Sequence, residues 1–160
     1  MKTRSVLAPV IFAVMAAASL RLAAGWLPGS PRAAVHDFYT YHFAHDMAFT
    51  AEGVEQRAAW LAPDLLALCR IYFAHPPPPD EAPMIDGDPF TDSQEYPTSF
   101  EVHRERTVGP FARVSVTFVG PSFRRIVEVR LTRTGSSWLI TDVARQGELS
   151  LRDLLEMAVR

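Results

Sequence analysis

The stretch VSVTFVGPSFRRIVEVRL, residues 114–131, decides the fold class of this protein. Apolar residues occupy every second position from 114 to 118 and again from 127 to 131, and Gly120-Pro121 lies between the two runs. A period of two is typical of strands that bury one face, and a Gly-Pro step is typical of a turn. The stretch therefore predicts two neighbouring strands of an antiparallel sheet.

The same alternation flanks this central pair on both sides. One run begins with Phe100 and Val102, and another begins with Trp138 and Ile140. Steps that contain glycine again separate these runs from the central pair. We therefore expect four strands in sequence, joined by short turns.

Three helical segments precede the strands. Ser30-Pro31 is typical of a helix start, and apolar and aromatic residues then recur at helical spacing as far as His45. A second helix is expected over residues 52–61 and a third over residues 64–73. The run Pro76 to Pro79 ends the third helix, because proline lacks the backbone donor and clashes with the preceding turn.

The remaining segments complete the architecture. Residues 76–99 form a long polar connection rich in Pro and Asp, and connections of this length are often functional. Ser150, followed by Asp153, opens a short last helix over residues 151–159. This order predicts an α+β fold, in which N-terminal helices pack on one face of a curved antiparallel sheet of about four strands.

Composition limits the class of protein. The chain has 160 residues, 48% of them hydrophobic, and one cysteine. These values exclude intrinsic disorder, a disulfide framework and a zinc site built from cysteines. Cys69 is expected to be a small buried hydrophobic residue, and pairing with another chain is the alternative.

The first 24 residues have the pattern of a secretory signal peptide. A positively charged start is followed by an uncharged run from Val6 to Leu20 and then by small residues. At about 1.5 Å per residue this run is too short to cross a bilayer, although an uncleaved anchor is the alternative. We therefore expect residues 25–160 to be a single domain that is periplasmic or secreted and has no stable membrane span after cleavage.

Charge is divided along the chain. Without residues 1–24 the chain holds 13 basic and 18 acidic residues, a balance that argues against nonspecific nucleic-acid binding. Residues 34–99 carry a net charge of −9, whereas residues 100–133 carry +4 and seven arginines. Several of these arginines alternate with the apolar face, so they should point outward or across to the acidic loop. They form either a solvated strand face neutralised by that loop or an anion-binding surface.

Two clusters could in principle hold a metal ion. Asp86, Asp88 and Asp92 offer oxygen ligands, but Phe90 stands where a calcium-binding EF-hand loop needs a polar ligand. We expect instead a structural loop in which Asp side chains cap backbone donors and Phe90 enters the core. The second cluster, on the first helix, lacks the HExxH spacing of zinc proteases. Its members are His36, His42 and His45, with Asp37 and Asp46 nearby.

Short motifs resemble the bacterial domain-of-unknown-function 3828 family. They are the loop DPFTDSQE, residues 88–95, and the strand WLITDV, residues 138–143, which follow helices with the pair Phe38-Tyr39. The likeness covers residues 33–155, and members of that family are small exported proteins or lipoproteins. Here Glu95 replaces the usual Asp, and the lipobox cysteine is absent. The order of elements is similar to the cystatin-like, NTF2-like α+β cone, a fold used for both binding and catalysis.

The sequence predicts an exported, non-enzymatic domain that binds a small ligand or a cell-envelope protein through loop 84–97 and the adjoining sheet. Asp88, Gln94, Trp138 and Asp142 are the residues expected to organise this region. Their structural alternative is that Gln94 and Asp142 satisfy buried backbone donors and that Trp138 fills the core. No catalytic residue, metal or cofactor is predicted.

Two other function classes stay open. One is a small hydrolase or isomerase that uses His36 or His42 with a carboxylate inside a cone cavity. The other is an inhibitor or immunity partner of a cell-envelope enzyme, with the acidic loop as its insertion element. An enzyme needs titratable groups that converge in a concave pocket, whereas a binding module can keep a filled interior and a flat sheet face rich in arginine.

Overall fold

The computed structural model describes residues 27–160, so the predicted signal peptide and its cleavage site lie outside the described residues. The elements of residues 27–160 follow the predicted order of helices, long loop, strands and a last helix. They are α2 (Pro31–Phe43), α3 (Ala51–Gln56), the 3₁₀ helix η1 (Ala58–Trp60), α4 (Pro63–Ala74), β1 (Ser99–Val108), β2 (Phe111–Val119), β3 (Arg124–Thr134), β4 (Ser137–Ala144) and α5 (Leu151–Ala158).

Helix α2 begins as the sequence predicts. The hydroxyl of Ser30 accepts a hydrogen bond from the amide of Ala33 at 3.1 Å, and Pro31 occupies the first turn. The helix ends at Phe43 and not at His45. After that point the chain turns, and the carbonyl oxygen of Asp46 accepts a hydrogen bond from a side chain of the next helical segment.

The second predicted helix is broken in the structure. A single helix was expected over residues 52–61, but α3 ends at Gln56 and η1 follows from Ala58. The break lies at Arg57, whose backbone leaves the helical region (φ −98°, ψ 0°) and whose side chain is only 1% exposed. The prediction was wrong here because the buried side chain of Arg57 is held by Gly53 within α3 and also by His42 and Asp46 outside it.

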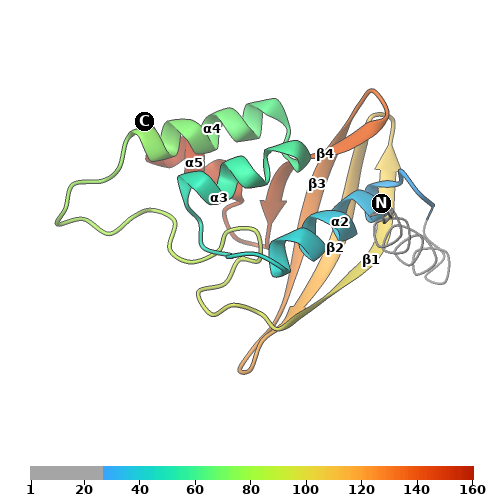
Figure 1. Cartoon of the computed structure of the whole chain (residues 1–160), viewed down its shortest axis with the longest axis horizontal. Coiled ribbons are helices and arrows are strands. Elements are labelled where there is room, and N and C mark those ends of the chain that lie inside the picture. Colours follow the sequence, from blue (N-terminus) through green and yellow to red (C-terminus); the bar gives the residue numbers. More distant parts are fainter. Residues whose placement is uncertain (1–26) are drawn as a thin grey trace, which may run out of the picture.

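The sheet is an antiparallel meander. Within residues 27–160 its four strands lie in the order β1-β2-β3-β4, and the helices pack against one face (Figure 1). The residues that alternate in the sequence also face this core, as the pairs Val116↔Val127 and Val129↔Val143 show. The predicted α+β fold is therefore confirmed.

The last helix packs beside α4 at the β4 edge of the sheet (Figure 1). The capping box at its start is complete, because the Ser150 hydroxyl accepts from the Asp153 amide and the Asp153 carboxylate accepts from the Ser150 amide. Leu151 and Leu155 bury their side chains in the core. Among residues 27–160, no helix combines the length and the apolar character needed to cross a membrane.

Candidate functional site

A buried carboxylate holds the long loop against the helices. Asp88 lies on this loop, and its Oδ2 accepts hydrogen bonds from the Thr91 hydroxyl at 2.6 Å and from His42 Nε2 at 2.8 Å. Its Oδ1 accepts from the amide of Phe90 at 3.0 Å. The side chains of His42 and Asp88 are 1% and 0% exposed. The contact therefore joins two segments 46 residues apart in the sequence and is sealed from water.

Arg57 completes this buried network from the break between α3 and η1. Its Nε donates to His42 Nδ1 at 2.7 Å, and its two terminal nitrogens donate to the carbonyl oxygens of Gly53 and Asp46, each at 2.7 Å. Because His42 Nδ1 accepts a hydrogen bond, the imidazole proton lies on Nε2 and faces Asp88. Burial lowers the pKa of Arg57 below its ordinary value, and the charge of Asp88 works in the opposite direction.

The histidine–carboxylate pair has the composition of a general base but not its access to substrate. His42 does meet a carboxylate, yet the partner is Asp88 and not the sequence neighbour Asp46. Both groups are fully enclosed, and a general base must reach the proton that it removes. His36, the other histidine considered, lies in α2 within 3.8 Å of Asp37. The buried network therefore serves to position the loop.

The loop itself is closed by a short backbone pairing. Asp88 and Ser93 exchange backbone hydrogen bonds of 2.8 and 3.1 Å. Gly87 precedes this pair with φ +87°, and a Cβ atom there would lie 2.5 Å from the Ser93 carbonyl oxygen. A side chain cannot fit at that point, so the residue must be glycine. Phe90, at the tip of the closed turn, is 2% exposed, which confirms the expectation that it enters the core.

Tyr39 of α2 adds a second link to the same turn. Its hydroxyl donates to the carbonyl oxygen of Phe90 at 2.6 Å, and the tyrosine is fully buried. Burial raises the pKa of Tyr39 well above its ordinary value, and the charge of Asp88 adds to the effect. The phenol therefore remains a hydrogen-bond donor over the whole neutral range.

Asp92 connects the loop to the sheet side of the molecule. Its Oδ2 lies 3.1 Å from Arg145 Nε and 3.8 Å from Arg125 Nε. Burial raises the pKa of Asp92 above its ordinary value, and the two arginines partly offset this rise. The backbone of Asp92 has φ 52°, a conformation that aspartate tolerates better than most residues. The predicted contact between strand arginines and the acidic loop is therefore confirmed for Arg125.

An open cleft of about 430 Å³ lies between the loop and the turn that joins β2 to β3. Gln94 lines it, with its side-chain amide donating to Asp86 at 2.7 Å, and Ser122 donates to Glu95 across it at 2.7 Å. Gln94 is exposed, so the structural alternative in which it satisfies buried backbone donors is wrong. Asp86, Asp88 and Asp92 each bind a different partner, and their carboxylates serve three separate contacts.

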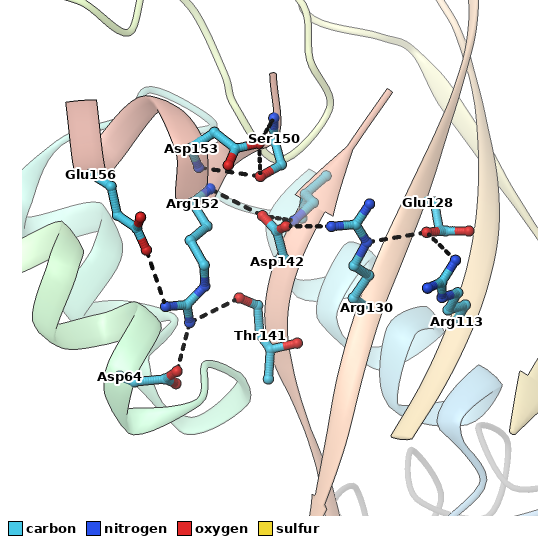
Figure 2. A network of polar contacts seen from close by, with 11 residues as sticks. Asp64, Arg113, Glu128, Arg130, Thr141, Asp142, Ser150, Arg152, Asp153 and Glu156 are labelled. Atoms are coloured by element: carbon cyan, nitrogen blue, oxygen red, sulfur yellow. Dashed lines mark hydrogen bonds and ion pairs between the residues drawn. The ribbon is translucent and has the colours of Figure 1, made fainter. Parts of the chain in front are cut away.

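Asp142 is the centre of a second polar network, on β4 (Figure 2). Its Oδ1 accepts from the backbone amides of Val143 at 2.9 Å and Arg152 at 3.0 Å, and its Oδ2 accepts from Arg130 at 2.9 Å. Arg152 also donates to the Asp64 carboxylate at 2.6 Å. The carboxylate thus holds the first turn of α5 on the sheet, which matches the structural role expected for Asp142.

The four predicted site residues do not converge on one site. Asp88 lies in the buried network, while Gln94 lies in the open cleft. Trp138, at the start of β4, is half-buried and packs against the core near the first turn of α2, and Asp142 faces α5. Sequence reasoning missed Arg57. The available signal was that Arg57 is the one basic residue of the predicted helix 52–61, where it follows two glutamates and precedes Ala-Ala-Trp.

Cys69 is fully buried in α4, as predicted. Burial raises the pKa of its thiol to about 12. The thiolate is the reactive form of cysteine, so the folded protein does not present Cys69 as a nucleophile.

The similarity found to known proteins is to solved structures. Neither a scan of family models nor a search of curated proteins finds a match. Among solved structures, this chain is similar to a chain of the type VI native effector–immunity complex Tae3-Tai3 from Ralstonia pickettii. The two are 28% identical with a TM-score of 0.57, and the match covers 76% of this chain and 98% of that chain. The selenomethionine form of that complex matches at 28% identity and a TM-score of 0.55, covering 75% and 99%.

Proposed function

We propose that this protein is a periplasmic immunity-type protein, which binds a toxic effector protein and neutralises it. The observation that carries the proposal is its similarity, at 28% identity, to almost the whole of one chain of an effector–immunity complex. An immunity partner is also one of the alternatives that the sequence leaves open, with the acidic loop as its insertion element. The domain of unknown function 3828 resemblance, also a proposal, is compatible with this role.

Three features support the immunity role over that of a catalytic effector. The His42–Asp88 pair is enclosed, the Cys69 thiol is buried, and a single contiguous core fills the space between helices and sheet. A filled interior leaves the surface for recognition, whereas an enzyme needs reactive groups that line a pocket. Binding another protein through its surface is the activity that this arrangement supports best.

The pattern of the first 24 residues supports the location that we propose. The uncharged run from Val6 to Leu20 behind a basic start is typical of export. We therefore propose that the chain meets its effector in the periplasm, after removal of residues 1–24.

The proposal is tested by finding the partner and then measuring protection. The chain carries a C-terminal affinity tag in the bacterium that encodes it, is cross-linked in living cells, and is purified for mass spectrometry. We expect one main protein partner, whose periplasmic expression alone arrests growth of a laboratory host. Co-expression of the full chain should restore growth. A matched chain that begins at Met followed by residue 25, and so stays in the cytoplasm, should give no protection.

The outcomes separate the alternatives. A partner that is harmless when expressed alone, or toxicity that persists despite complex formation, would overturn the immunity role. Protection by the leaderless chain would overturn the periplasmic location. Recovery of a bound small molecule in place of a protein would replace the proposal with a ligand-binding function.

A further inference from the structure

A groove of about 600 Å³ crosses the outer face of the sheet where β1 and β2 meet. We call it the arginine groove, and its principal residues are Arg104, Arg106, Val108, Phe111, Arg113 and Glu128. We propose that the arginine groove is the docking surface for an acidic patch on the partner protein. This inference rests on the proposed function, because it names the surface and the partner chemistry of the same complex.

A β-bulge gathers the arginines on this face. The pairing of β1 with β2 shifts between Val102 and Glu105, so that His103 and Arg104 together face Ser115 of the neighbouring strand. Without the extra residue, Arg104 would share the inward face of Val102. Bulges re-aim side chains in this way and are common beside functional surfaces. As a result both Arg104 and Arg106 line the groove.

The strand register then sets like charges opposite each other. Arg106 pairs with Arg113 across β1 and β2, and Arg113 pairs with Arg130 across β2 and β3. Directly opposed like charges destabilise a sheet, so folding alone gives no reason for this row. Glu128 offsets part of it, at 3.6 Å from Arg113 and 3.1 Å from Arg130.

The groove keeps an excess of positive charge. Within residues 27–160 no carboxylate lies in ion-pair distance of Arg104 or Arg106, and both are exposed. Their guanidinium groups can therefore bind carboxylates of another molecule, because the planar guanidinium can donate two parallel hydrogen bonds to one carboxylate. A partner with clustered Asp or Glu residues would supply the charges that the row lacks.

Exposed apolar side chains lie among these arginines. Phe111 is 63% exposed and Val108 78% exposed, and they face each other as register partners at the end of the β1–β2 hairpin. Aromatic residues and arginine are enriched at the centres of protein–protein interfaces, where they contribute most of the binding energy. The combination favours a protein partner over a free anion.

The charge division of the chain also selects the partner and its orientation. The helical half and loop, residues 34–99, carry a net charge of −9, and residues 100–133 carry +4. An acidic patch would be repelled by the first region and attracted by the second, which fixes the docking direction. A basic partner would instead be drawn to the loop, so the occupant of the arginine groove is acidic.

The test compares two charge reversals in the complex with the captured partner. Arg104→Glu together with Arg106→Glu should weaken binding roughly 100-fold, because like charges then meet across the interface. Arg124→Glu is the matched control, an exposed arginine on the same sheet but outside the groove, and should change binding by less than about threefold. Phe111→Ala should weaken binding at least tenfold with little change in salt dependence. Thermal unfolding shows that each variant is folded.

The results distinguish this inference from the proposed function. Equal binding by all variants would overturn the arginine groove while leaving the immunity role in place. Equal loss in Arg104→Glu/Arg106→Glu and in Arg124→Glu would also overturn it, because diffuse attraction would then explain the complex. Failure to capture a toxic partner is the failure of the proposed function alone.

A second measurement does not need the partner. NMR spectra of the arginine Nε–H groups are recorded with poly-L-glutamate and with polyphosphate at matched charge. Saturable shifts of Arg104, Arg106 and Arg113 with poly-L-glutamate, absent in the double variant, support a carboxylate-binding surface. Tighter binding of polyphosphate at the same groups would overturn the acidic-protein assignment in favour of a phosphate site. Absence of shifts with either probe would overturn the surface.

Discussion

Two aspartates fasten distant parts of the chain by the same chemistry in different surroundings. Asp88 fixes the loop through the amide of Phe90 and the imidazole of His42, and its side chain is 0% exposed. Asp142 fixes α5 through the amide of Arg152, and its side chain is 7% exposed. Each carboxylate therefore accepts a hydrogen bond from a backbone amide that would otherwise have no partner, in the loop or at the helix start.

The difference lies in where the balancing cation is. Arg57, which balances Asp88 through His42, is 1% exposed, whereas the side chain of Arg130, which binds Asp142, is 42% exposed. Loss of one member of an enclosed network leaves a charge that water cannot reach, and loss of one member of an open network does not. The enclosed network thus ties the loop to α2, and the open one leaves the side chain of Arg130 partly exposed on the sheet.

The largest effect is expected at the enclosed carboxylate. Asp88→Ala removes the acceptor of three hydrogen bonds and leaves Arg57 buried without a counter-charge, so the free energy of unfolding should fall by about 3–5 kcal/mol. Urea unfolding followed by circular dichroism measures this. Asp86→Ala is the control, because among residues 27–160 that exposed carboxylate binds only Gln94, on the same loop, and it should cost less than about 0.5 kcal/mol. Similar losses in the two variants would contradict the contrast.

A smaller effect is expected at the open carboxylate. Asp142→Ala leaves the amides of Val143 and Arg152 without their acceptor, and the free energy of unfolding should fall by about 2 kcal/mol. Because α5 packs on α4, we also expect its loss of anchoring to expose Cys69. The thiol, whose pKa burial raises to about 12, should resist Ellman's reagent at pH 8 in the parent protein and react faster in this variant.

The control for this effect keeps the α5 amide in place. Asp64→Ala removes the exposed carboxylate whose Oδ2 binds the Arg152 side chain and whose Oδ1 accepts from the Leu65 amide in the first turn of α4. Thiol labelling in Asp64→Ala should match the parent protein. Faster labelling there would show that α5 is held by its side-chain ion pair and not by the Asp142 carboxylate.

Sequence reasoning recovered what depends on local pattern. The strands followed from a period of two, and α5 followed from Ser150 and Asp153, because alternation and capping are written within a few consecutive residues. The burial of Phe90 was also predicted, since an apolar residue within a polar loop must find the core. The outward arginines at 113 and 130 followed from the same alternation.

The candidate site was recovered less well, because its contacts join distant segments. His42 and Asp88 are 46 residues apart, and the pairing depends on the path of the chain between them. Arg57 was missed because charged residues are normally exposed and only a network of partners reverses that rule. The β1 bulge at His103 and Arg104 shifts the alternation by one residue, and a sequence pattern alone does not show where such a shift occurs.

A third effect of intermediate size is expected at the second link to the loop. Tyr39→Phe removes the hydroxyl that donates to Phe90 and leaves a buried carbonyl unpaired, at a cost of about 1 to 2 kcal/mol. Burial, with the Asp88 charge adding to it, raises the pKa of Tyr39 in the folded protein, whereas the unfolded chain ionises near about pH 10. The contribution is therefore complete below pH 10 and decreases as the pH rises further.

This pH dependence isolates the contribution of the Tyr39 phenol. Unfolding of the parent protein and of Tyr39→Phe is compared between pH 8 and pH 11. The difference in stability between the two proteins should shrink as the pH rises. A constant difference would show that the phenol ionises equally in both states and that its enclosure has no effect on titration.

The smallest effect is expected when the cation is removed from the open network. Arg130→Ala breaks the contacts with Asp142 and Glu128, but its side chain is 42% exposed and water can take its place, so the loss of stability should stay below about 1 kcal/mol. It also removes one of two directly opposed arginines, which offsets part of the loss. The same substitution at Arg57 should cost several times more, because Asp88 would stay buried without a counter-charge. Urea unfolding of the two variants at low and high salt measures the ratio. If Arg130→Ala proved as costly as Arg57→Ala, exposure of the cation would not be what distinguishes the two networks, and the arginines of the sheet face would be structural and not free for a partner.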